Sequence, residues 1–286
     1  MAQGTTRGKR RLGRFIKPIR ERSALKVEEI AKRASCSAQT VYRLENGEAL
    51  PSRLRISAIL AAIGVTDEER ERAWQLWEIA DVDAAVVAHA EDLPVKYRRF
   101  RLDESEATRE RTLDMVGIPG ILQTPAYATA ISRAAHRLIR DNHWEERAGA
   151  ERRERQSLLT QTAEPLAFHS LVSEAAIRNM IGSPKIMAEQ LDHVLTMMEL
   201  PNVTIQVLPF DFGEHGLMSG PLILFDFSDD ESEDAAYVES VIGIEVVRRD
   251  AVAALRSVWE DVASAAASPE RSAEIIKAER DRAEAT

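Results

Sequence analysis

The 286-residue sequence has only one cysteine, Cys36, and few aromatic residues, which make up 5% of the chain. A single cysteine excludes an internal disulfide and is typical of a reducing compartment. No apolar run approaches the roughly 18 residues that a membrane-spanning helix needs. The basic N-terminus is also not followed by the apolar core of a secretory signal. We therefore expect a cytoplasmic protein without membrane contact.

Sequence motifs of common catalytic sites are missing as well. The chain has no phosphate-binding glycine-rich loop with Lys and Ser or Thr, no nucleophile elbow and no dinucleotide fingerprint. None of the six histidines pairs with another His or a Cys at metal-binding spacing. The acidic segment 226–237 does not fit a calcium loop, because Glu231 stands where glycine is needed and Tyr237 where glutamate is needed. We expect no enzymatic activity, no bound metal and no cofactor.

The charges that are present are unevenly distributed. Residues 1–56 contain 14 Lys and Arg against 5 Asp and Glu, whereas the remaining 230 residues contain 24 basic and 42 acidic side chains. Such a basic segment is the electrostatic footprint of a nucleic-acid-binding domain. The acidic remainder is repelled by phosphate and is expected to point away from DNA. With 44% hydrophobic residues and a length that suits two domains, the chain is expected to be globular.

Residues 37–47 read Ser-Ala-Gln-Thr-Val-Tyr-Arg-Leu-Glu-Asn-Gly and have the marks of a short amphipathic helix. Ser37 is a favoured N-cap, and Gly47 suits the left-handed conformation that ends a helix. Val41 and Leu44 are three residues apart, which places both on one apolar face. Arginine and glutamine read guanine and adenine through paired hydrogen bonds, so we predict that this helix enters a DNA major groove. Its polar face carries Gln39, Thr40, Tyr42 and Arg43.

Further amphipathic segments surround this helix. Apolar spacing predicts helices over 12–22, 27–34 and 54–64, and Thr66 with Glu69 forms the capping box of another. Two tryptophans in that last helix are interpreted as packed core. We divide the chain into a flexible basic arm (1–11), a helix-turn-helix domain (12–65), a connecting helix with a linker (66–94) and an α+β effector, partner or dimerisation domain (95–286).

A set of spaced features runs through about residues 12–65. They are Glu28-Glu29-Ile30-Ala31, the Ser-Cys-Ser turn at 35–37, Val41, Leu44-Glu45-Asn46-Gly47, Pro51 and the apolar series 54–63. Together they resemble the helix-turn-helix domain of the Cro and phage-repressor family, also called XRE-type. Val27 is a departure, because this family often has Gln at that position, so a contact made by that glutamine is not expected here.

The resemblance implies roles for individual side chains. The residues that it implies approach bases are Ala38, Gln39, Thr40 and Arg43. Those expected to contact phosphates or to position the domain on DNA are Ser37, Tyr42, Asn46, Arg14, Lys17 and Arg53.

The rest of the chain mixes helix and strand patterns. Period-two alternation predicts a half-buried strand at 203–208. Further strands are predicted at 113–116, 166–171, 222–227 and 236–241, and helices at 98–111, 174–181 and 250–267, with others beginning at 183 and 268. The last helix is highly charged, which leaves open whether it frays or docks on a partner. We expect an all-α N-terminal domain of four to five helices and a C-terminal α+β domain with a small mixed or antiparallel sheet.

Short segments of this second part carry another resemblance. They are 119–127 (Pro-Gly-Ile-Leu-Gln-Thr-Pro-Ala-Tyr), 152–156 (Arg-Arg-Glu-Arg-Gln), 173–178, 190–191 and 201–210. In order and spacing they resemble the C-terminal domain of actinobacterial Scr-type antitoxin-like transcriptional regulators, over about residues 97–245. The resemblance implies a regulator that is commonly encoded beside a small partner protein, with no known reaction and no established ligand.

Two loops are the expected rims of any effector pocket. Glycines and prolines in 117–125 require sharp turns in a partly buried segment, and 213–216 lies between two predicted strands. The candidate effector residues are Gly120, Leu122, Gln123, Tyr127 and His215.

These observations predict a sequence-specific DNA-binding transcriptional regulator. Helix-turn-helix proteins usually bind as two-fold dimers, so we expect a homodimer on a double-stranded operator. The C-terminal domain is expected to bind a small-molecule effector or a small protein encoded nearby. The alternative is an antitoxin-like interaction protein that neutralises a small partner and autoregulates its operon.

Overall fold

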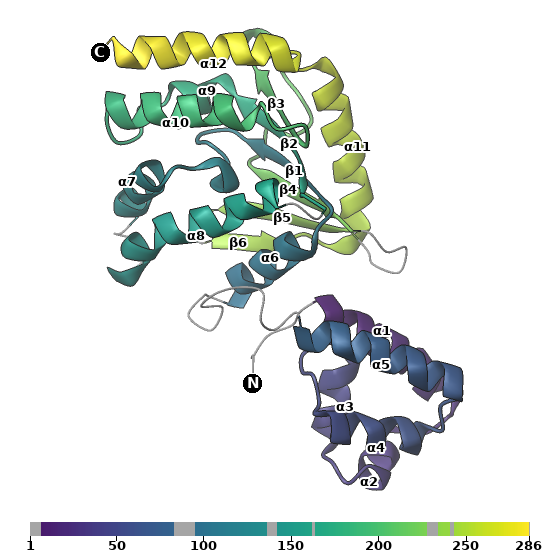
Figure 1. Ribbon diagram of the computed structural model, residues 1–286. Helices are drawn as coiled ribbons and strands as arrows, with labels where there is room; N and C mark the ends of the chain where they lie inside the picture. The colour runs from purple at the N-terminus through teal and green to yellow at the C-terminus, as the bar shows by residue number, and fades with distance from the viewer. Residues whose placement is uncertain are drawn as a thin grey trace. The chain divides into compact units, whose positions relative to one another are not determined.

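The computed structural model describes residues 7–82, 95–135, 142–161, 164–227, 234–240 and 243–285 (Figure 1). It contains two compact units, Met1–Glu106 and Ala107–Thr286, which are described separately. The boundary predicted near residue 94 lies outside the described residues. Helix α6 (Val95–Glu106), which the sequence pattern places at the start of the second domain, belongs by its contacts to the first unit.

The first unit is helical, as predicted. After α1 (Arg7–Arg22) come α2 (Val27–Arg33), α3 (Ala38–Glu45), α4 (Arg53–Ile63) and α5 (Asp67–Val82). The prediction of a flexible arm over residues 1–11 is wrong for residues 7–11, because α1 begins at Arg7. Arg10 pairs with Asp103 of α6, a contact between distant residues that the local sequence does not reveal.

One apolar core holds these helices together. Val41 and Leu44 are fully buried, as their spacing predicts. Trp74 and Trp77 pack against this core, and the Trp77 indole N–H donates to the carbonyl oxygen of Pro51 at 2.8 Å. The interpretation of the tryptophans as packed core is therefore confirmed. Other buried members of this core are Leu12, Ile16, Ile30, Ile56, Ile59, Leu60 and Leu76.

Two glycines allow α1 to approach the end of α3 closely. A Cβ atom on Gly13 would lie 2.5 Å from the carbonyl oxygens of Leu44 and Glu45. A Cβ atom on Gly47, which has φ +67°, would lie 2.5 Å from the Cα of Arg10. At both positions the backbones of the two segments are so close that no side chain fits between them. The two glycines therefore allow the short distance between α1 and the end of α3.

The second unit is built on a six-stranded sheet with the order β3-β2-β1-β4-β5-β6. Its strands are β1 (Arg109–Asp114), β2 (Ala167–Ser173), β3 (Val203–Leu208), β4 (Leu222–Asp226), β5 (Ala235–Ser240) and β6 (Gly243–Val246). Strands β1, β2 and β3 are parallel, and β4, β5 and β6 continue the sheet in antiparallel pairs. The sheet is mixed, and the predicted α+β fold is confirmed.

Strand β1 lies elsewhere than predicted. The charged residues 109–111 favour a helix in the sequence but form the start of the strand, and residues 115–116 fall outside it. Arg111 pairs with Asp226 of β4 at 2.7 Å, and the hydroxyl oxygens of Thr112 and Ser170 lie 2.8 Å apart. Cross-strand partners thus offset the cost of burying these polar side chains.

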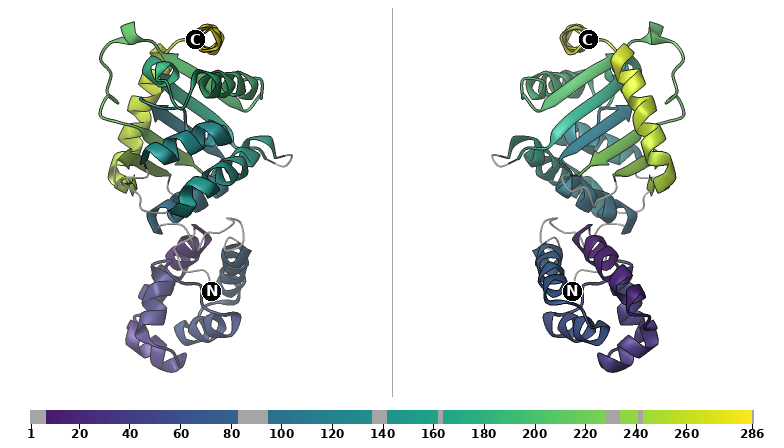
Figure 2. Two further views of the ribbon diagram at one scale, coloured as in Figure 1. Left: turned by 90° about the vertical axis from the view of Figure 1, so that its left-hand side faces the viewer. Right: turned by 90° about the vertical axis from the view of Figure 1, so that its right-hand side faces the viewer.

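Helices cover both faces of the sheet (Figure 2). On one face lie η3 (Gly120–Leu122), α7 (Pro125–Ala135), α8 (Asn142–Thr160), α9 (Glu174–Arg178) and α10 (Pro184–Met197). The other face is covered by α11 (Arg249–Ala265), whose Trp259 packs with Leu113, Leu171 and Leu224. The sheet therefore separates two apolar cores.

The charged last helix, α12 (Pro269–Glu284), docks on its own chain. It packs along α10 and the edge strand β3. Ser272 and Ile276 are fully buried, and the Ser272 hydroxyl accepts a hydrogen bond from the backbone N–H of Val207 at 2.8 Å. Of the two alternatives that the sequence left open, fraying is therefore excluded for the described residues.

Gly13→Ala is expected to destabilise the protein by about 1–3 kcal/mol, because the added methyl group meets rigid backbone. Helix propensity alone predicts the opposite sign, a gain of about 1 kcal/mol. Urea unfolding measures the difference. Lys17→Ala, at an exposed position of the same helix, serves as the control, and a stabilised Gly13 variant would show that α1 and α3 do not touch here.

Asp114, at the end of β1, makes stability depend on pH. Burial, and then the negative charge of Glu239, raise its pKa to about 7. Because this pKa lies above that of the unfolded chain, the folded state binds the proton more tightly, and stability falls as pH rises from about 4 through 7. Asp114→Asn should flatten this fall in thermal unfolding scans at pH 5 and pH 8. The exposed Asp211→Asn should leave it unchanged, and an equal effect of both variants would refute the assignment.

Candidate functional site

Helix α3 presents one polar face to solvent. Gln39, Tyr42 and Arg43 are exposed, while Ala38 and Thr40 are half-buried. The opposite face is dry, since its apolar side chains lie in the core. The structure therefore brings the predicted base-reading residues together on one short helix. Their contacts with DNA stay a prediction.

The turn before α3 is held by several hydrogen bonds. Ser37 caps the helix, because its hydroxyl accepts from the Thr40 backbone N–H at 3.2 Å and lies 2.9 Å from the Thr40 hydroxyl. Ser35 adopts the left-handed conformation with φ +51°. The Arg55 guanidinium of α4 donates to the carbonyl oxygens of Ala34 and Ser35. These bonds define where α3 begins.

The end of α3 is anchored by an ion pair with α1. The Nη2 of Arg20 donates to Glu45 Oε2 at 3.0 Å, and its Nε donates to the other carboxylate oxygen. Only 4% of the Glu45 side chain is exposed. The hydrogen bond to Glu45 raises the pKa of Arg20. A two-point bond of this kind fixes orientation as well as distance.

Two carboxylates lie beside side chains on the exposed face of α3. The Tyr42 hydroxyl donates to Glu28 of α2 at 3.3 Å, and Arg43 Nε lies 4.0 Å from Glu48 Oε2. Negative charge beside these side chains weakens non-specific attraction to phosphate. Sequence reasoning gave Glu28 and Glu48 no role on this face and did not pair Arg20 with Glu45. The only signal was a glutamate, Glu45, directly beside the buried face of α3.

The predicted phosphate-contacting residues are spread over several helices. Arg14 and Lys17 lie on α1, and Asn46 is the C-cap of α3. Arg53 begins α4, where its guanidinium lies 5.1 Å from the centre of the Trp74 ring and 3.6 Å from a Glu78 carboxylate oxygen. Arg53 thus has a packing role against α5. Val27 is buried in the core, which accounts for an apolar residue at that position.

Four of the candidate effector residues lie together on one face of the sheet. Gly120, Leu122, Gln123 and Tyr127 belong to η3 and the start of α7. The Tyr127 hydroxyl accepts from the Ile118 backbone N–H at 3.1 Å, and the Gln123 side-chain amide donates to the Ile118 carbonyl at 2.8 Å. The polar groups of Gln123 and Tyr127 therefore hold the loop that begins at Ile118 in its conformation.

Side chains of α8 and α10 make further hydrogen bonds to this loop. Gln190 of α10 accepts from the Thr124 backbone N–H at 2.7 Å and donates to the Leu122 carbonyl at 2.8 Å. Gln156 of α8 donates to the Gln123 carbonyl at 2.8 Å, and Arg152 donates to the Gln123 side chain at 3.0 Å. Three of the segments that carry the second resemblance, 119–127, 152–156 and 190–191, thus meet around one loop.

His215 does not join this group. It follows η4 (Phe210–Phe212), and its ring lies 5.6 Å from that of Phe212. The next residues pack on the α11 side, where a Cβ atom on Gly216 would lie 2.5 Å from Val258. The sheet stands between His215 and the loop at 120–123. The loops follow different strands, and sequence reasoning had no means to assign them to a face.

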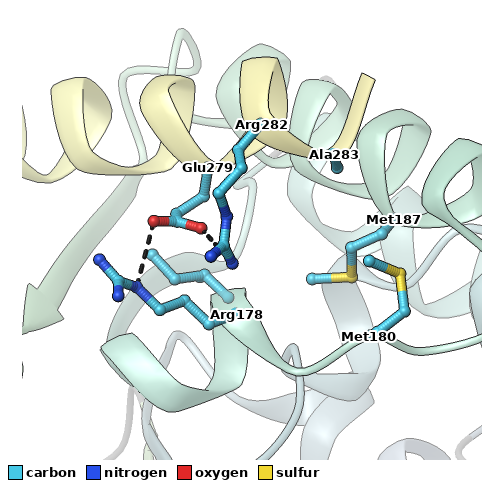
Figure 3. Close-up of a pocket in the computed structure, with 7 residues that line it drawn as sticks. Arg178, Met180, Met187, Glu279, Arg282 and Ala283 are labelled. Atoms are coloured by element: carbon cyan, nitrogen blue, oxygen red, sulfur yellow. Dashed lines mark ion pairs between the residues drawn. The ribbon is translucent and has the colours of Figure 1, made fainter. Parts of the chain in front are cut away.

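Two cavities lie where strands β2 and β3 end and lead into α9 and η4. The first, about 240 Å³, is an open pocket lined by residues of α9, α10 and α12 and by Met180 (Figure 3). The second, about 460 Å³, is lined by residues of α9, η4 and α12. Arg178 and Glu279 line both. Sequence reasoning missed this region, because its walls come from segments about 100 residues apart.

Within the described parts of the chain, no group of three His, Cys, Asp or Glu side chains is arranged to hold a metal ion. The middle of the acidic segment, 228–233, lies outside the described residues, as do His89 and His136. No helix in the described ranges is long and apolar enough to cross a membrane.

Two family models match this chain. One, described as a helix-turn-helix domain, matches residues 11–73 and confirms a DNA-binding domain of this type around α3. The other, described as a domain of unknown function (DUF5753), matches residues 97–278, which is more than half of the chain. No curated protein and no solved structure matches it.

Arg20→Met is expected to cost about 3–5 kcal/mol in urea unfolding, because it leaves the Glu45 carboxylate buried without its partner. The double variant Arg20→Met/Glu45→Met should lose clearly less than the sum of the single variants, since apolar pairs replace buried ion pairs at little cost. Additive losses would contradict the pairing.

Proposed function

We propose that this chain, which belongs to the family described as a domain of unknown function (DUF5753), is a sequence-specific transcriptional regulator that binds its operator as a homodimer. One observation carries the proposal. Helix α3 has a fully buried back, Val41 and Leu44, and an exposed front that carries Gln39 and Arg43. That is the geometry of a helix whose side chains reach base edges in a major groove.

Specificity and affinity come from different parts of the first unit. Gln39 and Arg43 supply paired hydrogen bonds to adenine and guanine, while Ser37, Lys17 and neighbouring basic side chains hold phosphates. The excess of basic residues in 1–56 supports this division. Binding by such a segment weakens as salt rises, because phosphate contacts release counterions.

Dimerisation follows from the size of one domain. A single α3 covers about half of an operator, and two-fold dimers place two recognition helices about one helical turn apart. In this proposal the second unit senses a ligand or a small protein partner and changes the spacing of the two helices. The protein acts in the cytoplasm and is associated with the nucleoid while bound to DNA.

The antitoxin-like alternative uses the same DNA-binding domain for autoregulation. It differs in the occupant of the second unit, which is then a small protein that the chain neutralises, as the resemblance to Scr-type regulators implies. Co-purification with the product of an adjacent short gene favours the alternative. Retained operator control in cells that lack that gene favours the ligand-sensing form.

Gln39→Ala/Arg43→Ala is expected to weaken operator binding at least about a hundredfold, because each paired base contact is worth ~1–3 kcal/mol. The operator is first identified by mapping genomic binding sites, and affinity is then measured by fluorescence anisotropy. Gln161→Ala/Arg271→Ala, a matched pair of exposed residues in the second unit, is the control. If the Gln39→Ala/Arg43→Ala variant keeps its fold and still binds the operator specifically, the assignment of α3 as the recognition helix is wrong.

A further inference from the structure

Glu48 is an acidic residue in the most basic part of the chain. Residues 1–56 contain five carboxylates against 14 basic side chains. Within the part of the chain that the structure describes, the Glu48 carboxylate accepts no hydrogen bond and makes one ion pair, with Arg43. The other four carboxylates each accept a hydrogen bond inside the first unit; they belong to Glu21, Glu28, Glu29 and Glu45.

The backbone at the end of α3 places Glu48 beside Arg43. Gly47 is in the left-handed conformation, and its N–H donates to the carbonyl oxygen of Leu44 at 3.0 Å. The Glu48 N–H donates to the carbonyl oxygen of Arg43 at 2.7 Å. These two bonds form a Schellman motif, which folds the chain back over the last turn of the helix. Glu48 Oε2 then lies 4.0 Å from Arg43 Nε.

Stability does not account for a carboxylate at this position. About half of each side chain is exposed, 45% for Arg43 and 52% for Glu48, and exposed ion pairs contribute little to stability. The C-terminal end of a helix is also the negative end of its dipole, which disfavours an acidic side chain. Negative charge repels DNA phosphate as well. Glu48 therefore disfavours both the helix end and DNA binding, and Arg43 is the neighbour that offsets its charge.

The ion pair leaves the far edge of the Arg43 guanidinium open. Glu48 lies on the Nε side, and the two terminal nitrogens of Arg43 make no hydrogen bond or ion pair within the described ranges. Arginine reads guanine through two N–H donors that meet O6 and N7. Because a guanidinium has five N–H donors, Arg43 can keep Glu48 on its Nε side while its terminal nitrogens contact the base.

We infer that Glu48 is a positioning residue that makes the DNA contact of Arg43 selective for guanine. The inference rests on the proposed function, in which Arg43 reads a base. When Arg43 contacts guanine, the ion pair with Glu48 is kept. When Arg43 turns to a phosphate, Glu48 loses its partner and faces negative charge. Glu48 therefore disfavours the non-specific complex more than the specific one, which is selectivity through repulsion of the wrong partner.

The test compares two DNA duplexes with the full chain. One is the operator identified by mapping genomic binding sites, and the other has the same composition in shuffled order. Fluorescence anisotropy gives both dissociation constants and hence their ratio. Glu48→Gln should lower this ratio about fivefold, mainly by tightening binding to the shuffled duplex, which is the change expected for one exposed charge pair.

Glu21→Gln is the matched control. It removes the same charge from a similarly exposed side chain of the same unit, 55% for Glu21, but Glu21 lies beside Arg20 and not beside Arg43. It should tighten binding to both duplexes equally, because only long-range repulsion of phosphate is lost, and so leave the ratio unchanged.

A second comparison asks whether Glu48 acts through Arg43. In the Arg43→Ala background, Glu48→Gln should leave the ratio unchanged, and because Gln39 is kept there, a preference for the operator remains measurable. Single base-pair substitutions in the operator show at which positions Arg43→Ala relaxes discrimination. Glu48→Gln should relax discrimination at the same positions and at no others.

Three results would overturn the inference. They are an unchanged ratio for Glu48→Gln, an equal fall of the ratio for Glu21→Gln, and a fall that persists in the Arg43→Ala background. The last result would show that Glu48 contacts DNA by itself. If Arg43→Ala relaxes no position of the operator, the proposed recognition helix fails. If Arg43→Ala relaxes positions that Glu48→Gln leaves unchanged, only the role of Glu48 fails.

Discussion

The orientation of the exposed face of α3 depends on how α3 is held against α1. Gly13 and Gly47 permit backbone contact between the two helices, and the two-point ion pair between Arg20 and Glu45 fixes the angle at which they meet. Val41 and Leu44 then have to point inward, which turns the polar face to solvent. A shift of one helix by the width of a methyl group would move the side chains that the proposed function places at base edges.

In the second unit too, polar contacts between distant segments fix how the elements pack. Its mixed sheet separates two apolar cores, and several polar side chains in the interior are paired across strands or with the backbone of neighbouring loops. The loop at 119–125 is held by Gln123, Gln156 and Gln190. Gln123, which was predicted to line an effector pocket, therefore makes hydrogen bonds that hold the loop. The openings lie instead around Arg178 and Glu279, where α9 meets α12.

Much of the first unit could be predicted from the sequence because its signals are local. Helix caps such as Ser37 and the Thr66–Glu69 box act within four residues, and helical spacing alone assigns Val41 and Leu44 to the core. The start of strand β1 could not be predicted, because a charged residue such as Arg111 is tolerated there through a partner on strand β4, which is distant in sequence. The pocket beside Met180 could not be predicted either, because it is lined by residues of α9, α10 and α12, which are far apart in sequence.

The sequence by itself determined the helix-turn-helix pattern, the basic charge of the first 56 residues and the alternation of helix and strand in the rest. These depend on spacing and composition, which are read along the chain. Only the tertiary structure decided that α1 begins at Arg7, that α12 docks on α10 and β3, and that His215 lies apart from the loop at 120–123. Each of these depends on contacts between residues far apart in sequence, and such contacts form only when the chain is folded.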